Sequence, residues 1–258
     1  MPNIHSQALV ADSAILAENV EIGPFAIIED NVILGSGCRV ASLAKICSGV
    51  VMGENNIVEH GAVIGGLPQD LSFDPETKSG VTIGDGNTFR EYVTINRSTQ
   101  PGGNTILGDR NFFMAVVHLA HDVEIGNDNI FANNVMVAGH CRLGSKIFLG
   151  GGCGIHQFIH VGDYAMVQGN SGVTRDAPPY CIVHQINQLS GLNAVGLKRG
   201  GFSSAERKEI KHAYSLVLNS KFTRAEALEQ ADLLEWGPAA AKLIEAVRSP
   251  SSKGILTR

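Results

Sequence analysis

The sequence is short of the residues that usually build a compact core or a nucleic-acid-binding surface. Aromatic residues make up only 6% of its 258 residues, with a single Trp. Acidic residues outnumber basic ones and give a formal net charge of -5, so the chain lacks the positive excess typical of nucleic-acid-binding proteins. No apolar run approaches the ~20 residues that cross a bilayer, and the N-terminus lacks the charged and apolar segments of a signal peptide. We therefore expect a soluble, cytoplasmic protein with no transmembrane segment and no nucleic acid as partner.

Cysteine is also scarce and without pattern. The five cysteines form no CxxC motif and show no paired spacing, which is typical of small buried hydrophobic residues in a reducing compartment. Cys141 and Cys153 are expected to belong to the core rather than to act as nucleophiles.

What the sequence does have is a repeat. An aliphatic residue, or Met, recurs every six positions at the start of the chain: Ile4, Val10, Leu16, Ile22, Ile28, Leu34, Val40, Ile46, Met52, Val58 and Ile64. A second run of the same period extends from Leu107 to Val173, with Phe at two of its positions. Neither an amphipathic helix, with a period of 3.6, nor a half-buried strand, with a period of 2, produces this pattern.

A six-residue period predicts a parallel β-helix, a β-solenoid in which each hexapeptide forms one short side and points its aliphatic residue inward. The small residue that often follows, such as Gly23 or Gly35, is expected to let the chain turn the corner. Three sides close one coil, so residues 18 apart in sequence should lie above one another.

Two segments interrupt the repeat. The first lies near 66–82 and contains Gln69 and Asp70, and the second lies near 97–104 and is rich in glycine. Loops that leave so regular a scaffold are often functional, so we expect the first to contact substrate; a tolerated surface insertion is the alternative.

The repeat ends at Pro178-Pro179, because proline cannot continue the hydrogen bonding of a sheet. Two capping boxes and one proline then mark the starts of three short helices: Ser203-x-x-Glu206, Thr223-x-x-Glu226 and Pro238. We therefore divide the chain into a β-helix at 1–187 and a C-terminal helical domain at 188–258.

Titratable residues concentrate in the second run, at His118-x-x-His121-Asp122. The 18-residue coil should gather with them the polar residues one and two coils further along: Gly139, His140, His156 and Gln157. A neutral imidazole beside a carboxylate can act as a general base, and a glycine N–H one coil away can stabilise an oxyanion. Such a patch fits the direct attack of an alcohol on a thioester, without a cofactor.

Two other interpretations remain open. Several histidines at a subunit interface could bind zinc, as three do in carbonic anhydrases with this repeat. The β-helix could also be a scaffold without catalysis. Asn133, Asn134 and Gln157 suggest a polar cleft suited to a sugar rather than a zinc lyase, and clustered titratable residues argue against a scaffold.

At these residues the sequence resembles the family of UDP-N-acetylglucosamine O-acyltransferases, the acyl-carrier-protein-dependent enzymes that begin lipid A biosynthesis. The resemblance covers essentially the whole chain and rests on five stretches: His118-x-x-His121-Asp122, Asn133-Asn134-x-x-x-Ala138-Gly139-His140, His156-Gln157-Phe158, Pro178-Pro179-Tyr180 and Gly196-Leu197-Lys198-Arg199-x-Gly201-Phe202. It implies a left-handed β-helix, a homotrimer with active sites in clefts between subunits, and transfer of a 3-hydroxyacyl group to the 3-position of the nucleotide sugar.

The resemblance also implies roles for single residues. His121 would be the general base toward the sugar 3-hydroxyl, Asp122 would orient it, and the Gly139 N–H would bind the oxyanion. Gly169 stands at a position that sets acyl length, and glycine there implies an open groove for a longer chain. The implied contacts to sugar, phosphates or acyl chain are Gln69, Asp70, His118, Asn134, Ala138, His140, His156, Gln157, Asn193 and Arg199.

The sequence departs from the family pattern at several positions expected to face the nucleotide. The run Thr94-Ile95-Asn96-Arg97-Ser98 stands where Thr-Ile-His-Arg-Gly is usual, and Ser72 replaces Lys. Val195 replaces an acidic residue and Gly200 a basic one. A divergent relative that acts on a different or 3-amino nucleotide sugar is therefore a second hypothesis.

Positive charge gathers near the start of the helical region despite the negative total. Acyl carrier protein is strongly acidic, so this cluster favours it as the acyl donor, with coenzyme A as the alternative. The cluster consists of Lys198, Arg199, Arg207, Lys208, Lys211 and Lys221.

Overall fold

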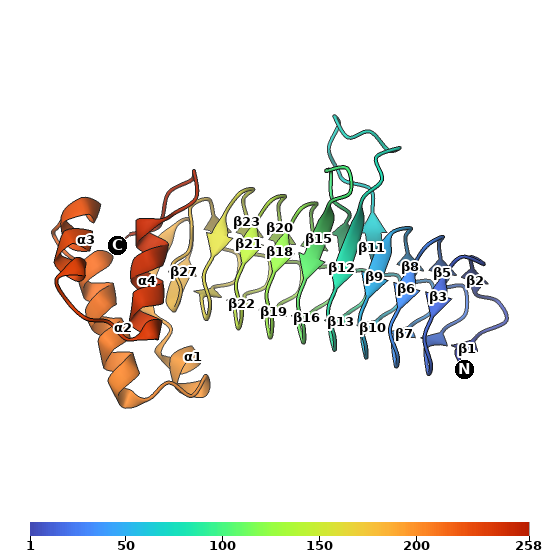
Figure 1. Cartoon of the computed structure of the whole chain (residues 1–258), viewed down its shortest axis with the longest axis horizontal. Coiled ribbons are helices and arrows are strands. Elements are labelled where there is room, and N and C mark those ends of the chain that lie inside the picture. The colour runs from blue at the N-terminus through green and yellow to red at the C-terminus, as the bar shows by residue number, and fades with distance from the viewer. Residues whose placement is uncertain (258) are drawn as a thin grey trace.

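The computed structural model describes residues 1–257. The chain winds into a long three-sided prism of parallel strands, and four helices close its C-terminal end (Figure 1). Each coil contributes one strand to each of three sheets, so that every strand from β1 to β23 pairs with the strand three places later in the chain. This arrangement is the parallel β-helix that the six-residue period predicts.

The first sheet contains β1 (Asn3–Ile4), β4 (Glu21–Ile22), β7 (Arg39–Val40), β10 (Ile57–Val58), β13 (Thr88–Phe89), β16 (Phe112–Phe113), β19 (Ile130–Phe131), β22 (Phe148–Leu149), β25 (Met166–Val167), β27 (Cys181–His184) and β28 (Gln188–Leu192). The second contains β2 (Leu9–Val10), β5 (Ile27–Ile28), β8 (Lys45–Ile46), β11 (Val63–Gly66), β14 (Thr94–Asn96), β17 (His118–Leu119), β20 (Met136–Val137), β23 (Gly154–Ile155) and β26 (Gly172–Val173). The third contains β3 (Ile15–Leu16), β6 (Ile33–Leu34), β9 (Val50–Met52), β12 (Gly80–Ile83), β15 (Asn104–Leu107), β18 (Glu124–Ile125), β21 (Arg142–Leu143) and β24 (His160–Val161).

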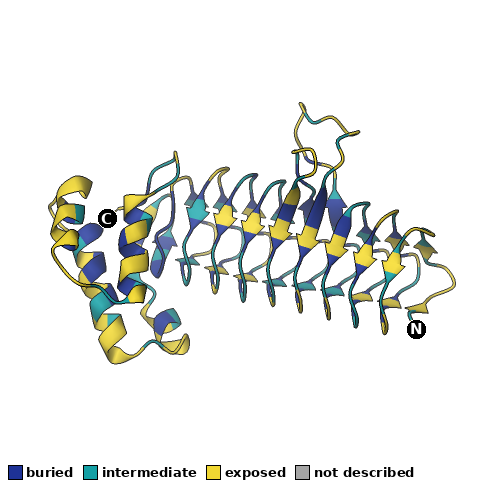
Figure 2. Ribbon diagram, in the orientation of Figure 1, coloured by how far each residue is buried: buried dark blue, intermediate teal, exposed yellow. Residues whose placement is uncertain are grey.

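The repeating aliphatic side chains fill the inside of the prism. From Ile22 onward they are almost fully buried, while the residue before each of them faces out, and Figure 2 shows this alternation along the strands. Ile4 is 45% exposed because the first coil is the open end of the solenoid. In the wider middle coils the few aromatic residues stack on one another, with ring centroids of Phe89, Phe113 and Phe131 5.1 and 4.6 Å apart.

The corners form differently from the prediction. At most corners the left-handed backbone lies at the third residue after the inward aliphatic, as at Asn19, Phe25 and Asn31, and not at the small residue directly after it. That small residue instead allows the coils to stack closely: a Cβ on Gly35 would lie 2.5 Å from the carbonyl carbon of Gly53. The assignment of the turn to this glycine was therefore wrong.

A column of buried asparagines links successive coils at one corner. The Asn87 N–H donates to Asn56 Oδ1 at 2.8 Å, that of Asn111 to Asn87 Oδ1 at 2.9 Å, and that of Asn129 to Asn111 Oδ1 at 3.0 Å. These bonds satisfy backbone donors that the turns leave without a strand partner.

The two interruptions of the repeat are loops at residues 67–79 and 97–103, which we call the first and second excursions. Both leave the prism where the second sheet passes to the third, on adjacent coils, and they project on the same side (Figure 1). They lengthen their coils from 18 to 31 and 24 residues, which are the sequence distances between the paired residues Ile57 and Thr88 and between Thr88 and Phe112. Strand pairing continues on either side, with one register shift between Ile64 and Gly66, where β11 pairs with β14 just before the first excursion.

The helices are α1 (Ala194–Arg199), α2 (Ser204–Val217), α3 (Arg224–Asp232) and α4 (Pro238–Arg248). Both capping boxes form, and Pro238 occupies the first turn of α4. The short α1 was not predicted. Strand pairing also extends beyond residue 187, because β27 and β28 form an antiparallel hairpin that ends at Leu192.

The chain after α4 returns to the end of the prism. The Asp176 carboxylate, which is buried, accepts a hydrogen bond from Ser251 Oγ at 2.7 Å, and Leu256 N–H donates to the Asp176 carbonyl at 2.9 Å. Among residues 1–257, none of the helices combines the length and apolar character needed to cross a bilayer.

Candidate active site

His121 and Asp122 lie at the corner that follows β17, on the coil directly after the second excursion. The registers His118–Met136 and Met136–Gly154 confirm the 18-residue stacking. The His140 N–H donates to the His121 carbonyl at 3.1 Å, and the Phe158 N–H donates to the Gly139 carbonyl at 3.1 Å. One column of corners therefore carries both excursions, the His–Asp pair and the histidine of the next coil.

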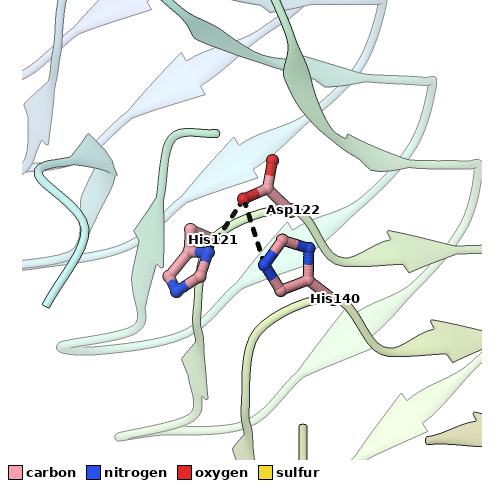
Figure 3. Close-up of side chains that lie close together, drawn as sticks. All are labelled: His121, Asp122 and His140. Carbon is pink, nitrogen blue, oxygen red and sulfur yellow. Dashed lines mark hydrogen bonds and ion pairs between the residues drawn. The ribbon is translucent and has the colours of Figure 1, made fainter. Parts of the chain in front are cut away.

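The two side chains form a largely buried pair. His121 Nδ1 lies 2.8 Å from Asp122 Oδ2, and the side chains are 15% and 11% exposed. His140 approaches from the next coil with its Nε2 3.9 Å from the same oxygen and its ring edge-on to that of His121 (Figure 3). Phe158, one coil further, stacks flat on His140 with centroids 4.8 Å apart.

Asp122 is held by the second excursion, which sequence reasoning missed. Ser98 Oγ donates to Oδ1, while the Thr99 N–H and hydroxyl donate to Oδ2 at 3.1 and 2.6 Å. Burial alone would raise the pKa of Asp122, but the hydrogen bonds from Ser98, Thr99 and His121 outweigh it and lower the pKa from 3.8 to about 2. The one signal for this contact was the serine at position 98, where the family pattern has glycine.

The ionised carboxylate decides which nitrogen of His121 carries the proton. A carboxylate accepts hydrogen bonds only, so the Nδ1 that faces it must be the N–H of the neutral ring. The lone pair then lies on Nε2, at the other side of the ring and away from Asp122 (Figure 3). His121 lines the groove described below, and this nitrogen is the basic atom that a bound hydroxyl would meet.

Gly139 packs directly against the His121 ring. A Cβ at this position would lie 2.7 Å from Cε1 and 2.9 Å from Nε2 of His121, so no larger residue fits without moving the ring. Within the part of the chain that the structure describes, the Gly139 N–H donates to no acceptor. A free backbone donor beside a base is the arrangement that oxyanion stabilisation needs.

The pair opens into a groove of about 850 Å³ along the outer face of the second sheet. Seven of the sequence-predicted residues line it: Gln69, His118, His121, Asn134, Ala138, Gly139 and His156. Its other lining residues were not singled out in advance: Tyr92, Thr94, Val116, Ala120, Met136, Val137, Gly154, Ile155, Gly172, Val173 and Thr174. Val137, Ile155 and Val173 are buried inward positions of the repeat. The others lie outside the inward positions, so the inward-pointing period does not reveal them.

His118 is a neutral polar group on the floor of this groove. Its Nδ1 lies 2.8 Å from Thr94 Oγ1 on the preceding coil. Burial lowers the pKa of His118, because no negative partner compensates for the lost water. A neutral imidazole here can exchange hydrogen bonds with a ligand but adds no charge.

Other predicted residues lie outside the groove of a single chain. Asp70 is exposed on the first excursion, where the Ser72 N–H and hydroxyl each donate to Oδ1 at 2.8 Å and lower the pKa of Asp70. Gln157 and Gly169 are exposed at corners, and Arg199 is exposed on α1. Asn193 caps α1, since its Oδ1 accepts from the Gly196 N–H at 2.9 Å.

Three departures from the family pattern have local structural consequences. Ser72 fixes Asp70, as described above. Asn96 donates from Nδ2 to the Leu67 carbonyl at 2.9 Å and so ties down the start of the first excursion. Gly200 lies against Tyr164, where a Cβ would come within 2.4 Å of the ring, so a larger residue here requires the Tyr164 ring to move.

No cysteine near the site is a candidate nucleophile. Burial raises the pKa of Cys141 and of Cys153 to about 12, so both remain thiols at neutral pH. Within residues 1–257, the only cluster compact enough for a metal is His121, Asp122 and His140, whose ligand atoms lie within 4.8 Å of one another. It offers two histidines and a carboxylate, which differs from the three histidines of the zinc-lyase hypothesis.

Comparison with known proteins assigns the class. Residues 104–139 match the family model for the bacterial transferase hexapeptide repeat, which covers the coils that carry the His–Asp pair. Together with the base, the free backbone donor and the absence of a cysteine nucleophile among the described residues near them, this defines an acyltransferase of the hexapeptide-repeat class.

The particular family follows from the rest of the chain. Residues 176–256 match the model for domain 2 of UDP-N-acetylglucosamine O-acyltransferase. The acyl-[acyl-carrier-protein]–UDP-N-acetylglucosamine O-acyltransferases of Campylobacter concisus and Thermodesulfovibrio yellowstonii are 37% and 42% identical to this chain. The matches cover 85% and 89% of this chain and 84% and 90% of the relatives. The solved UDP-N-acetylglucosamine acyltransferase of Francisella novicida superimposes with a TM-score of 0.94 at 34% identity, over 99% of this chain and 94% of that one. The chain belongs to the UDP-N-acetylglucosamine O-acyltransferase family, and the expected left-handed β-helix is confirmed.

Proposed function

We propose that this enzyme transfers a 3-hydroxyacyl group from acyl carrier protein to the 3-hydroxyl of UDP-N-acetylglucosamine, the first step of lipid A biosynthesis. The relatives at up to 90% coverage are named for this donor and this acceptor. The observation that carries the proposal is the orientation of His121, whose Nδ1 is engaged by an ionised Asp122, whose Nε2 points away from it, and whose ring packs against Gly139.

The chemistry requires one base and no covalent enzyme intermediate. Nε2 of His121 removes the proton of the sugar hydroxyl as its oxygen attacks the thioester carbonyl carbon, and the Gly139 N–H stabilises the oxyanion that forms. When the tetrahedral intermediate collapses, the C–S bond breaks and the thiolate takes the proton from His121. Asp122 stays ionised throughout and stabilises the transient imidazolium.

The groove suits the two parts of such a substrate. Gln69, His118, Asn134 and His156 offer hydrogen bonds to a sugar near the base. Val116 and Met136, which are exposed on the groove wall, offer apolar contact to an acyl chain. We assign Asp70, His140, Gln157, Asn193 and Arg199 to binding as well, and Gly169 to chain-length selection.

Acyl carrier protein is the proposed donor because cations surround a cleft in the helical domain. This cleft, of about 500 Å³, lies beside α2 and is lined by Leu197 and by Arg207, Lys208 and Lys211. Lys208 and Lys211 form no ion pair with any residue that the structure describes, so their charge is available to an acidic protein.

A homotrimer completes the proposal. The outward positions of β16, β19 and β22 carry Phe112, Ile130 and Phe148, and the last two are 40% and 37% exposed. A second copy packed on this face would cover apolar surface on the same coils as the groove. It would also supply the predicted residues that lie outside the groove of one chain.

The unpaired cysteines are typical of a reducing compartment, and we place the reaction in the cytoplasm.

The test of the proposed reaction is His121→Ala. Purified enzyme is incubated with 3-hydroxyacyl carrier protein and UDP-N-acetylglucosamine, and the product is followed by mass spectrometry. We expect transfer to fall below detection while analytical ultracentrifugation still gives a trimer. Full activity of the variant would refute the assignment of the base.

The acceptor is tested separately, since Ser72, Asn96, Val195 and Gly200 depart from the family pattern. A panel crosses UDP-N-acetylglucosamine and its 3-amino analogue with carriers of graded acyl length, and with the matching coenzyme A thioesters. The proposed function requires the highest kcat/KM for the hydroxyl acceptor and a carrier-bound donor. A preference for the amine would instead support the second hypothesis, a divergent enzyme that acylates a 3-amino nucleotide sugar by the same mechanism.

A further inference from the structure

The second excursion reaches back onto the carboxylate that supports the base. Ser98 and Thr99 supply three donors to Asp122: the two hydroxyl groups and the Thr99 N–H. The Asp122 N–H in turn donates to Thr105 Oγ1 at 2.8 Å, on the strand that follows the excursion. The backbone and the side chain of Asp122 are thus both fixed by the preceding coil.

Gln100 donates a hydrogen bond to each of the two hydroxyl oxygens. Its backbone N–H donates to Ser98 Oγ at 2.9 Å, and its side-chain amide donates to Thr99 Oγ1 at 3.1 Å. Each hydroxyl oxygen thus accepts one hydrogen bond, and its own proton points to Asp122 because an ionised carboxylate can only accept. Both hydroxyl groups act as donors to an anion, which makes the contacts strong.

The excursion is itself rigidly held, by the first excursion. The Ser79 hydroxyl donates to the Ser98 carbonyl at 2.5 Å, and the Gly102 N–H donates to the Lys78 carbonyl at 2.8 Å. Arg97 Nη2 donates to the Pro75 carbonyl at 2.8 Å, and its guanidinium lies 5.4 Å from the centre of the Phe73 ring. Ser98 is fully buried by these contacts, so its hydroxyl has one stable position.

We infer that Ser98 and Thr99 are positioning residues for acyl transfer, which hold Asp122 in the orientation that keeps the proton of His121 on Nδ1. The inference rests on the proposed function, because it assigns a task to His121 in that reaction. Neither residue lines the groove, so both act through Asp122 and not on the substrate. The second excursion is then a part of the catalytic apparatus that does not touch the reacting atoms.

Substitution of the hydroxyl groups should separate kcat from KM. Thr99→Val keeps the shape of the side chain and the Thr99 N–H but removes one donor to Oδ2, and Ser98→Ala removes the donor to Oδ1. Loss of a hydrogen bond to a charged group is expected to lower kcat about tenfold. KM for the nucleotide sugar should stay within twofold, since the groove is unchanged. Thr99→Ser, which restores the hydroxyl, should recover most of the rate.

The matched control is Thr82→Val, the same substitution at an exposed position of β12. It should leave kcat unchanged, and the melting temperature of every variant shows whether the fold is intact. Ser98→Ala and Thr99→Val are independent, so misfolding of one leaves the other as the test.

Three results would overturn the inference: a folded variant with the kcat of the unmodified enzyme, a rise in KM at constant kcat, or a Thr99→Ser enzyme as slow as Thr99→Val. The His121→Ala enzyme, measured in the same assay, distinguishes failure of the proposed function from failure of the positioning role. If it is active, the proposed function fails. If it is inactive while Ser98→Ala and Thr99→Val are unaffected, only the positioning role fails.

Discussion

Gly139→Ala isolates the contact between the base and the oxyanion donor. The added methyl carbon would lie 2.7 Å from Cε1 of His121, where carbon atoms normally stay about 3.5 Å apart. The ring must therefore retreat by about 0.8 Å, while its Nδ1 is held at 2.8 Å by Asp122. A misplacement of about 1 Å costs roughly a hundredfold in rate, or about 2.7 kcal/mol in the barrier. We expect kcat to fall by about this factor.

The fold should tolerate the change, because Gly139 does not have the left-handed backbone that favours glycine. The assay compares kcat and the melting temperature of Gly139→Ala with those of Gly154→Ala. Gly154 lies in the same groove, and a Cβ there meets no atom within 4 Å. If both variants turn over equally fast, the close packing of glycine against the ring has no catalytic importance and the reasoning fails.

Two further predictions concern Asp122 and the acyl groove. Because the pKa of Asp122 is lowered from 3.8 to about 2 on folding, its contribution to stability is present above pH 4 and is lost as the pH falls toward 2. Between pH 5 and pH 3 this group should account for about 1 kcal/mol of the decrease in unfolding free energy. In urea titrations, the unfolding free energy of Asp122→Asn should decrease by about 1 kcal/mol less over this pH range. A pH dependence equal to that of the unmodified enzyme would contradict the assigned hydrogen bonds. Gly169→Met should shift selectivity several-fold toward shorter 3-hydroxyacyl carriers in a competition assay; unaltered selectivity would remove Gly169 from the acyl site.

The fold could be predicted because one period determines most of it. The six-residue repeat gives both the inward positions and the 18-residue coil, so the spacing from His121 to Gly139 became a spatial contact without further assumptions. Residues 18 apart in sequence lie above one another only where the coil length is constant. Corner geometry was assigned to the wrong residue because glycine serves two needs, a left-handed backbone and close approach, and the repeat does not separate them.

The contacts of Asp122 could not be predicted for the same reason. Ser98 and Asp122 are 24 residues apart, a distance set by an excursion whose length is unrelated to the repeat. Irregular loops satisfy their polar groups by contacts that no periodicity records. The helix α1 escaped notice because it has only six residues and its cap, Asn193, lacks the acidic partner of a capping box.

The asparagine column bears on how such a site can arise. Successive members are separated by 31, 24 and 18 residues, yet their N–H to Oδ1 distances stay between 2.8 and 3.0 Å. The spacing between stacked coils at this corner thus does not depend on how many residues are inserted at the corner between the second and third sheets. New loops can be grafted there one coil at a time, each above the last, without disturbing the coils that carry them. An architecture of this kind allows recognition elements to be exchanged while the reacting groups keep their places, which is a favourable starting point both for natural divergence and for engineering.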